Sequence, residues 1–486
     1  MRRAPKCNRS LTMFGVVLLL GASASLQAQD VNSAPEVSGA SQTAASLTGN
    51  FWQRLGEAYT QDWKGTAASG PAPLRRIPAA PLDATPFPSA DWNYGGSPTI
   101  GAPDGNTYPL MDAIDGATSR TKVYGWFNNG FDVSTSNKSK FANAPAAYYV
   151  TPNTIIPDQQ VLFIERLPDT VQTEHFDWGF RIAQLYGLDY RYTTGKGYVS
   201  QQLLQKNNTY GYDPVMVYVD LYFPQVADGL NIRMGRYISL PDIEAQLAPN
   251  NYTYSHSILY AIDPYTQTGI TASIKVNNHW LVQAGLSGGN DVALWTPDAK
   301  PTLTACVSYT WNDGKDNIYP CINSLNSGKY AYNNVQSFYN TWYHKFNGSW
   351  HTATEAWYMY EHDVPNIAEN VANPVPTETG ANGAFCSAGE QRCFAPEWAT
   401  VNYLEHEFSK RSYLSIRNEF VDDIKGQRTG YKTKYSEHLL SWGYWFGSTV
   451  LFRPEIRYER SYDAAAYDNG TKKNQFIVAG DVTYHF

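Results

Sequence analysis

The last twelve residues of the chain, 475–486, alternate strictly between two kinds of side chain and end on an aromatic residue. One face carries Phe476, Val478, Gly480, Val482, Tyr484 and Phe486, and the other carries Ile477, Ala479, Asp481, Thr483 and His485. A period of two is that of a β-strand, and an apolar face opposite a mostly polar one suits a strand between hydrocarbon and water. The pattern therefore indicates a membrane-spanning strand, with an edge strand of a soluble β-sandwich as the alternative.

The N-terminus has the features of an export signal. Four basic residues within 1–9 precede an apolar run at 11–22, and Ala28 ends a cleavage site. We therefore expect residues 1–28 to be a signal peptide, with cleavage after Ala24 as the alternative, and 29–47 to be a flexible mature N-terminus. The apolar run is shorter than the ~20 residues of a spanning helix. In an exported chain, the C-terminal strand resembles the assembly signal of bacterial outer-membrane barrels, so we expect the barrel-assembly machinery to recognise it at Phe486.

Composition argues against a nucleic-acid partner and favours a membrane barrel. Removing residues 1–28 takes away four basic and no acidic residues, which leaves 33 Lys and Arg against 44 Asp and Glu, a formal net charge of −11. Aromatic residues make up 14% of the chain, an excess expected where rings form girdles at membrane interfaces. Four of the five cysteines remain after cleavage, and an even number in an oxidising compartment predicts two disulfides.

Two segments precede the strand-rich part of the chain. In 48–64 an aromatic or Leu recurs every four residues, which predicts a short amphipathic helix. It could dock in the periplasm, lie on the membrane surface, or pack against the barrel mouth. Segment 65–119 is interrupted by proline too often for helix or sheet, so we expect an extended periplasmic linker or an arm that enters the lumen.

From residue 120 onward, amphipathic segments are separated by connections that are alternately very short and long. In outer-membrane barrels the periplasmic turns are short and the extracellular loops long. We therefore expect 120–486 to form an all-β, antiparallel up-and-down transmembrane barrel of about 16 strands (14–18), with both termini periplasmic. The predicted strands are 120–133, 158–167, 175–193, 213–224, 229–239, 266–276, 279–288, 302–312, 315–325, 335–346, 350–362, 397–409, 412–423, 434–446, 449–462 and 474–486.

Asp313-Gly314 is the most informative short turn. Asp-Gly between two strands favours a two-residue type I′ hairpin. Reflecting the chain about this turn places Cys306 opposite Cys321, as a hydrogen-bonded pair ~5.5 Å apart at Cα that faces the lumen and can form a disulfide. Cys386 and Cys393 lie in the longest outer loop, 363–396, and are predicted to form the second disulfide. Because CxxC spacing and nearby paired histidines are absent, we expect no metal site and no cofactor.

Charged residues share one face of several predicted strands. In 449–462, Arg453 and Arg457 alternate with apolar residues, and a slip of one residue would place both against lipid at a cost of about 4–8 kcal/mol. Opposed charges can create a field in a water-filled pore, to whose charge preference these two Arg would contribute. The alternative is that the charges pair and hold the wall rigid. The pore-lining candidates are Asp177, Arg181, Asp189, Arg191, Arg233, Glu355, Glu405, Glu407, Arg417, Glu419, Arg453, Glu455, Arg457, Glu459 and Asp481.

Loop 239–264 is long for a barrel loop and contains apolar residues of its own. A helical turn is expected at 242–247, followed by a Tyr-rich stretch. Long loops of this kind often fold inward, which makes 239–264 the candidate constriction, with an outward lid as the alternative.

Short motifs spread over most of 70–486 resemble those of the outer-membrane β-barrel porins known as beta-barrel porin-2. Besides the Pro-rich run 75–88, they are Tyr124-Gly125-Trp126, Asp177-Trp178-Gly179-Phe180-Arg181, Tyr186-Gly187, Gly235-Arg236-Tyr237, Leu240-Pro241-Asp242-Ile243-Glu244-Ala245-Gln246 and Tyr265-Thr266-Gln267-Thr268-Gly269. The resemblance implies a location and a barrel. It brings no settled substrate and no catalytic residues.

The functional hypothesis is a bacterial outer-membrane channel for passive diffusion of small polar solutes. Its expected partners are outer-membrane lipids, the assembly machinery and these solutes, and a homo-oligomer is left open. A non-conducting structural or adhesive barrel is the alternative. A barrel-borne hydrolase has less support, because Gly285-Leu286-Ser287-Gly288-Gly289 fits the G-x-S-x-G nucleophile elbow but no helix is expected after it. We therefore expect no enzyme activity.

Overall fold

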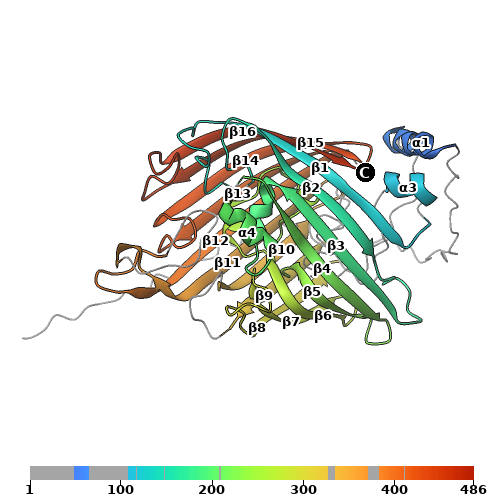
Figure 1. The fold of residues 1–486 in the computed structure, drawn as a ribbon, viewed down its shortest axis with the longest axis horizontal. Helices are drawn as coiled ribbons and strands as arrows, with labels where there is room; N and C mark the ends of the chain where they lie inside the picture. The colour runs from blue at the N-terminus through green and yellow to red at the C-terminus, as the bar shows by residue number, and fades with distance from the viewer. Residues whose placement is uncertain are drawn as a thin grey trace, which may run out of the picture. The chain divides into compact units, whose positions relative to one another are not determined.

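The chain folds into a closed antiparallel barrel of 16 strands, each hydrogen-bonded to its neighbours in sequence, with β1 also paired to β16 (Figure 1). The computed structural model describes residues 49–64, 108–116, 118–146, 148–206, 209–326, 334–369, 383–409 and 411–486. The predicted up-and-down barrel is therefore confirmed. The predicted signal peptide, the segment 29–47 and most of the Pro-rich segment lie outside the described residues.

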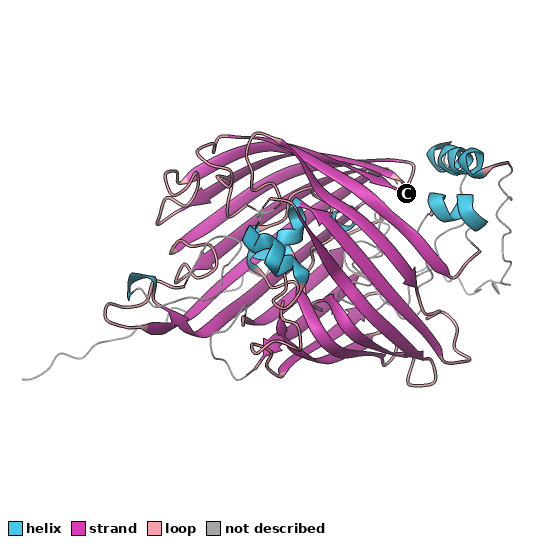
Figure 2. Cartoon of the chain, viewed as in Figure 1, coloured by secondary structure: helices cyan, strands magenta, loops and turns pink. Residues whose placement is uncertain are grey.

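Strands dominate the described part of the chain, and the helical elements are short (Figure 2). The strands are β1 (Thr121–Ser134), β2 (Ile155–Arg166), β3 (Asp177–Gly187), β4 (Gly211–Phe223), β5 (Leu230–Ile238), β6 (Thr266–Lys275), β7 (Trp280–Asn290), β8 (Thr302–Trp311), β9 (Asp316–Leu325), β10 (Gln336–Lys345), β11 (Trp350–Pro365), β12 (Arg392–Ser409), β13 (Ser412–Asp423), β14 (Thr433–Phe446), β15 (Val450–Ser461) and β16 (Asn474–His485). The helical elements are α1 (Phe51–Lys64), α3 (Pro109–Asp115), η2 (Leu188–Tyr192), α4 (Val199–Lys206), η3 (Ala248–Asn250), α5 (Ile258–Ile262) and η4 (Ile367–Glu369). Within the described residues, every helix is too short or too polar to cross a membrane.

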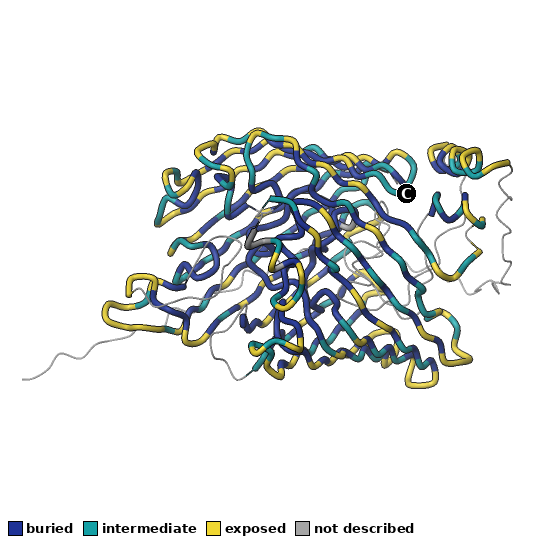
Figure 3. Tube along the Cα trace, in the orientation of Figure 1, coloured by how far each residue is buried: buried dark blue, intermediate teal, exposed yellow. Residues whose placement is uncertain are grey.

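The two faces of the wall differ as the alternation of side chains predicts. Along β15, Arg453 and Arg457 are buried, whereas Phe452, Ile456 and Tyr458 on the opposite face are exposed. The same alternation of buried and exposed residues runs along the other strands (Figure 3). Apolar side chains thus face lipid, and the charged face points into the barrel.

The barrel closes at the seam between the first and last strands. β1 pairs with β16 from Trp126 opposite His485 to Ser134 opposite Ile477. At the end of the seam, the backbone of Phe486 makes two hydrogen bonds with Gly125, at 2.9 and 3.3 Å. The C-terminal strand that alternates most clearly in the sequence therefore completes the barrel.

The turn between β8 and β9 differs from the sequence prediction. Asn312 and Asp313 both have positive φ, and Trp311 pairs with Asp316, so the connection has four residues instead of two. Two- and four-residue connections share the same midpoint, and Cys306 still lies opposite Cys321 in a disulfide. Along the two strands, hydrogen-bonded and non-hydrogen-bonded residue pairs alternate, and the longer connection exchanges the two kinds of pair. The cysteines therefore form a non-hydrogen-bonded pair with a Cα separation of 4.1 Å, closer than expected.

The structure also contains the predicted disulfide between Cys386 and Cys393. Cys386 lies in the connection between β11 and β12, whereas Cys393 is the second residue of β12, which begins earlier than the predicted loop 363–396 allows. The disulfide's ring of a few residues lies close to Val364, Ala384 and Ala395, which are buried together.

The predicted strand 175–193 is too long at its C-terminal end. β3 stops at Gly187, and the chain continues as the 3-10 helix η2. Gly187 has φ 148°, and an added Cβ would lie 2.0 Å from the carbonyl oxygen of Asp158. Asp189 and Arg191 therefore lie on η2 and not on a strand, which corrects their predicted placement.

Helix α1 contacts the barrel at the connection between β14 and β15. The Asp62 carboxylate accepts hydrogen bonds from the backbone N–H of Ser448 (2.9 Å), from its hydroxyl (2.6 Å) and from the hydroxyl of Thr449 (2.8 Å). Tyr59 stacks on Tyr484 of β16 with ring centroids 5.4 Å apart. Of the three placements considered for this helix, packing against the barrel mouth is the one these contacts fit.

Candidate functional site

The connection between β5 and β6, residues 239–265, lies inside the barrel, and we call it the inner loop. Every one of its residues whose exposure is described is buried. A loop at the end of two membrane strands can be buried throughout only if it folds back into the lumen. The structure thus selects the inward of the two arrangements left open by the sequence.

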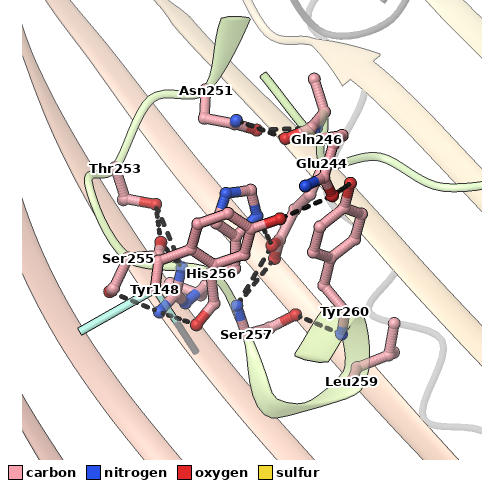
Figure 4. Close-up of polar contacts among 12 residues, drawn as sticks. Tyr148, Glu244, Gln246, Asn251, Thr253, Ser255, His256, Ser257, Leu259 and Tyr260 are labelled. Carbon is pink, nitrogen blue, oxygen red and sulfur yellow. Dashed lines mark hydrogen bonds and ion pairs between the residues drawn. The ribbon is translucent and has the colours of Figure 1, made fainter. Parts of the chain in front are cut away.

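The helical turn expected at 242–247 is not formed. Asp242 has φ 103°, which lies outside the range of a right-handed helix. The loop's helical residues are instead η3 and α5. Helix α5 begins after Ser257, whose hydroxyl accepts a hydrogen bond from the Tyr260 N–H at 3.0 Å (Figure 4).

Arg453 of β15 holds the first half of the inner loop. Its Nη1 donates to the carbonyl oxygens of Ala248 at 2.8 Å and Asn251 at 2.7 Å. Its Nε donates to Asp481 of β16 at 3.0 Å, and both side chains are fully buried. One guanidinium therefore joins the inner loop to the wall and pairs with a carboxylate at the same time.

Arg417 of β13 holds the middle of the inner loop. Its Nη1 donates to the carbonyl oxygen of Ser255 at 2.6 Å and to the Thr253 hydroxyl at 3.0 Å, and its Nη2 donates to the carbonyl oxygen of His256 at 3.0 Å. Its Nε donates to Glu437 of β14 at 2.8 Å. The fork of donors on one Arg matches several carbonyl oxygens at once, which a Lys could not do.

Two carboxylates of the wall accept hydrogen bonds from the inner-loop backbone. Glu455 accepts from the N–H groups of Tyr254 at 3.1 Å and Ser255 at 3.2 Å. Glu419 accepts from the N–H groups of Ile258 at 2.8 Å and Leu259 at 2.5 Å, at the start of α5. Both carbonyl and N–H groups of the inner loop therefore find charged partners, which removes the cost of burying an irregular backbone.

Within the inner loop, Glu244 and His256 form a buried pair. His256 Nδ1 lies 2.9 Å from Glu244 Oε2, and Glu244 also accepts a hydrogen bond from the Ser257 N–H (Figure 4). The Tyr403 hydroxyl donates a further hydrogen bond to Glu244. Burial acts to raise the pKa of Glu244, but the bond to His256 and the charge of Arg417 outweigh it and lower the pKa to about 2. Burial lowers the pKa of His256 to about 4, although Glu244 acts in the opposite direction.

Aromatic rings fix the inner loop to a second loop of the barrel. Tyr148, from the connection between β1 and β2, stacks on His256 with centroids 3.8 Å apart, and His256 stacks on Tyr260 at 4.5 Å. The hydroxyl of Tyr148 donates to Gln246 Oε1 at 2.7 Å. The inner loop is thus held on one side by charged wall residues and on another by stacked rings.

The predicted pore-lining residues fall into groups. Those of β13, β15 and β16 form one connected network with Glu437 and the inner loop: Arg417, Glu419, Arg453, Glu455, Arg457, Glu459 and Asp481. Others pair across neighbouring strands, as Arg181 does with Glu165 at 2.5 Å and Arg233 with Asp220 at 2.9 Å.

The rest of the candidates lie apart from the network. Asp177 pairs with Arg166, Asp189 accepts from Gln159 at 3.0 Å, and Arg191 lies over the ring of Phe141. Three Glu residues of β11 and β12 are also candidates: Glu355, Glu405 and Glu407. Glu355 accepts a hydrogen bond from the Thr341 hydroxyl at 3.0 Å, and Glu405 accepts one from the Ser415 hydroxyl at 2.7 Å. A pore-lining role for all fifteen stays a prediction.

Sequence reasoning missed Glu437, which bridges the network. It accepts from Arg417 and lies 3.0 Å from Arg457. The sequence contains a signal for Glu437, because this residue lies on the same face of the predicted strand 434–446 as Tyr435 and Leu439, which point inward. Glu244 and His256 carried no such signal because they lie in a loop, where no period applies.

No arrangement of three or more His, Cys, Asp or Glu side chains suited to a metal ion occurs among the described residues. The candidate elbow serine also lacks the required context. Ser287 lies within β7, and a loop follows that strand.

Comparison with known proteins gives a family. The family described as "Putative beta-barrel porin-2, OmpL-like" matches residues 120–486. No curated protein matches the sequence. Among solved structures, an anion-selective porin from Comamonas acidovorans is similar at 8% identity, with a TM-score of 0.47, over 75% of this chain and 99% of that one. The outer membrane channel DcaP of Acinetobacter baumannii is similar at 9% identity, with a TM-score of 0.48, over 75% of this chain and 97% of that one. These two likenesses carry no argument about solutes.

Proposed function

Because the chain belongs to the OmpL-like beta-barrel porin-2 family of the bacterial outer membrane, we propose that it lets small polar solutes diffuse passively through its lumen. The observation that carries the proposal is the inner loop, which lies inside the barrel and is fastened to its charged wall. A barrel of sixteen strands is wide enough for an aqueous channel. An inner loop narrows such a channel to the size of small solutes, so that 239–265 is its constriction.

A non-conducting structural barrel is the second candidate, and one observation favours it. The Arg residues of the inward network are buried and paired with carboxylates, as for Arg453 with Asp481 and Arg417 with Glu437. Such pairs would also serve to hold a wall rigid. The two candidates differ in whether ions cross the barrel.

The proposal includes no catalytic activity. The position of Ser287 supports this part of the proposal. A nucleophile elbow needs a sharp turn from a strand into a helix, and Ser287 lies inside β7. We also propose that the assembly machinery recognises the last strand, whose final residue, Phe486, pairs with the first strand at the seam.

Conductance in planar lipid bilayers tests the proposal. The full-length mature protein, purified in detergent, is expected to insert with stepwise current increases in potassium chloride, and heat-unfolded protein is the control. Liposomes containing the protein should also swell in neutral sugars at rates that fall with sugar size. A folded protein that gives neither current steps nor swelling would refute the channel and support the structural barrel.

A further inference from the structure

Buried charge is strongly unbalanced in this barrel. Among the described residues, 24 buried side chains are Asp or Glu and nine are Arg or Lys. The buried Arg residues of β5, β13 and β15 each have a carboxylate partner on a nearby strand. The excess of acid therefore lies elsewhere, and part of it gathers at the ends of β11, β12 and β13 that lead into the long loops.

Four carboxylates form this acidic cluster: Glu361 of β11, Glu397 of β12, Asp423 of β13 and Asp263 of the inner loop. Glu397 lies directly opposite Asp423 in the pairing of β12 with β13. Glu397 also pairs with Met359 of β11, so Glu361 is its diagonal neighbour. Glu361, Asp423 and Asp263 all act electrostatically on Glu397. Like charges directly opposite one another destabilise a sheet, so the arrangement needs a compensating charge.

Glu397 differs from its neighbours in its contacts. Asp423 accepts hydrogen bonds from the backbone N–H groups of residues 427–429, and Glu361 accepts one from Gln427. Glu397 is 1% exposed, and neither of its carboxylate oxygens has a hydrogen-bond donor among the described residues. A buried charged carboxylate without donors is costly, so the group must either bind a proton or have a cation beside it.

Within the described parts of the chain, one cationic side chain acts on the cluster, and it also binds the inner loop. Arg428, from the connection between β13 and β14, acts electrostatically on Glu397 and Glu361. Its Nε donates to the carbonyl oxygen of Ile262 in the inner loop at 2.7 Å, and its Nη2 donates to the same oxygen. A single guanidinium can offset the charge of one carboxylate, so each of the others is buried either protonated or beside a bound cation.

We propose that the acidic cluster binds small monovalent cations, inorganic or ammonium, and makes the channel select cations over anions. The inference rests on the proposed channel function and adds the charge class of its solutes. Glu397 is the residue that the cation contacts. The inward parity of Glu361, Glu397 and Asp423 directs their charge toward the lumen.

The reversal potential under a potassium chloride gradient tests the proposal in the full-length mature protein. The wild type is expected to favour K⁺ over Cl⁻. The variant Glu397→Gln/Glu361→Gln removes two charges with little change of shape. For an ion that passes along the lumen about 10 Å from the cluster, in water at 0.1 M salt, two unit charges should change the K⁺/Cl⁻ permeability ratio about threefold. The control variant, Glu369→Gln/Glu390→Gln, removes two exposed charges from the connection between the same two strands and should leave the ratio unchanged.

Folding of each variant is checked by heat-dependent mobility in gels and by the midpoint of unfolding in urea. Because Gln removes a buried charge that lacks a donor, Glu397→Gln alone should unfold at the same urea concentration as the wild type or a higher one. A marked loss of stability would mean that Glu397 has a structural partner and would overturn its role as the cation ligand.

The outcomes separate the inference from the function on which it rests. The cation-selective role of the acidic cluster is refuted if the wild type conducts but favours Cl⁻. It is also refuted if the cluster variant and the control variant have the same permeability ratio. Neither result contradicts the proposed channel. Absence of current in the folded wild type overturns the channel, and the cation preference with it.

Discussion

Replacing Arg453 with Gln should both destabilise the barrel and widen the channel. The change leaves Asp481 buried with an amide and a hydroxyl as its remaining neighbours, Asn128 and Thr483. Removing one member of a buried ion pair costs about 3–5 kcal/mol. It also removes the donor to the carbonyl oxygens of Ala248 and Asn251, so the first half of the inner loop loses its attachment to β15.

The stability effect is measured as the midpoint of urea unfolding in lipid vesicles. With a slope of about 3 kcal/mol per molar urea, a loss of 3–5 kcal/mol lowers the midpoint by about 1–2 M. The double variant Arg453→Gln/Asp481→Asn removes both charges, and the coupling between the two sites should be at least about 1.5 kcal/mol. From the sequence alone, replacing Arg453 and Arg457 with Gln is expected to leave the barrel folded, because the lipid-facing side chains are untouched. The buried pair of Arg453 with Asp481 leads instead to a prediction of reduced stability.

Arg236→Gln provides the matched control for the channel effect. Arg236 pairs with the buried Asp213 at 2.8 Å, and its further acceptors lie on residues 193, 214 and 266, outside the inner loop. Both variants should lose stability, but only Arg453→Gln should raise the single-channel conductance. Equal conductance in the wild type and in Arg453→Gln, with stability lost as predicted, would refute the inner loop as the constriction.

Three further results are expected. A tag inserted in 366–391 should be labelled on intact cells and one at Asn347 should not, whereas the reverse would invert the topology. Asp62→Ala removes three charge-assisted hydrogen bonds, so the free energy of α1 binding to the barrel should fall in magnitude by about 2–3 kcal/mol. Amide hydrogen exchange in α1 should become faster. The buried His256, with its pKa lowered from 6.5 to about 4, contributes about 3 kcal/mol of stability that is present above pH 6.5 and lost as the pH falls towards 4. His256→Gln should flatten this part of the stability profile, and an unchanged profile would assign the acid transition to other groups.

The register of the wall could be predicted from the sequence because an error would be costly. In β15 a slip of one residue would move Arg453 and Arg457 into lipid, and the structure has both of them facing inward. The positions of Cys306 and Cys321 were predictable for a different reason. Their pairing depends on the midpoint of the turn and not on its length, so it holds although the connection is longer than expected.

The end of β3 could not be predicted from alternation alone. Asp189 and Arg191 continue the parity of Asp177 and Arg181, so the period gives no sign that the strand has stopped. The cause is the close approach of Gly187 to the backbone of Asp158, a contact between two strands that only the folded chain brings together. An isolated glycine within a strand was the available signal.

The contacts of the inner loop were beyond sequence reasoning for a more general reason. Arg417 and Arg453 bind backbone carbonyl oxygens of residues more than 160 positions earlier in the chain. Every residue has a carbonyl group, so no pattern of residue types marks the ones that are bound. The composition of the loop could suggest that it folds inward, but not what holds it there.

The seam between β1 and β16 joins the first and last strands of the barrel, and this separation in the chain affects how the barrel folds. The residues of β15 that bind the inner loop lie about 200 positions after it in the chain. The barrel can close only when β16 pairs with β1. Contacts of such long sequence separation form late and slowly. The inner loop therefore takes its final position only when the last strand has been added. For the channel proposed above, the consequence is that a barrel lacking its last strand would be a leaky one.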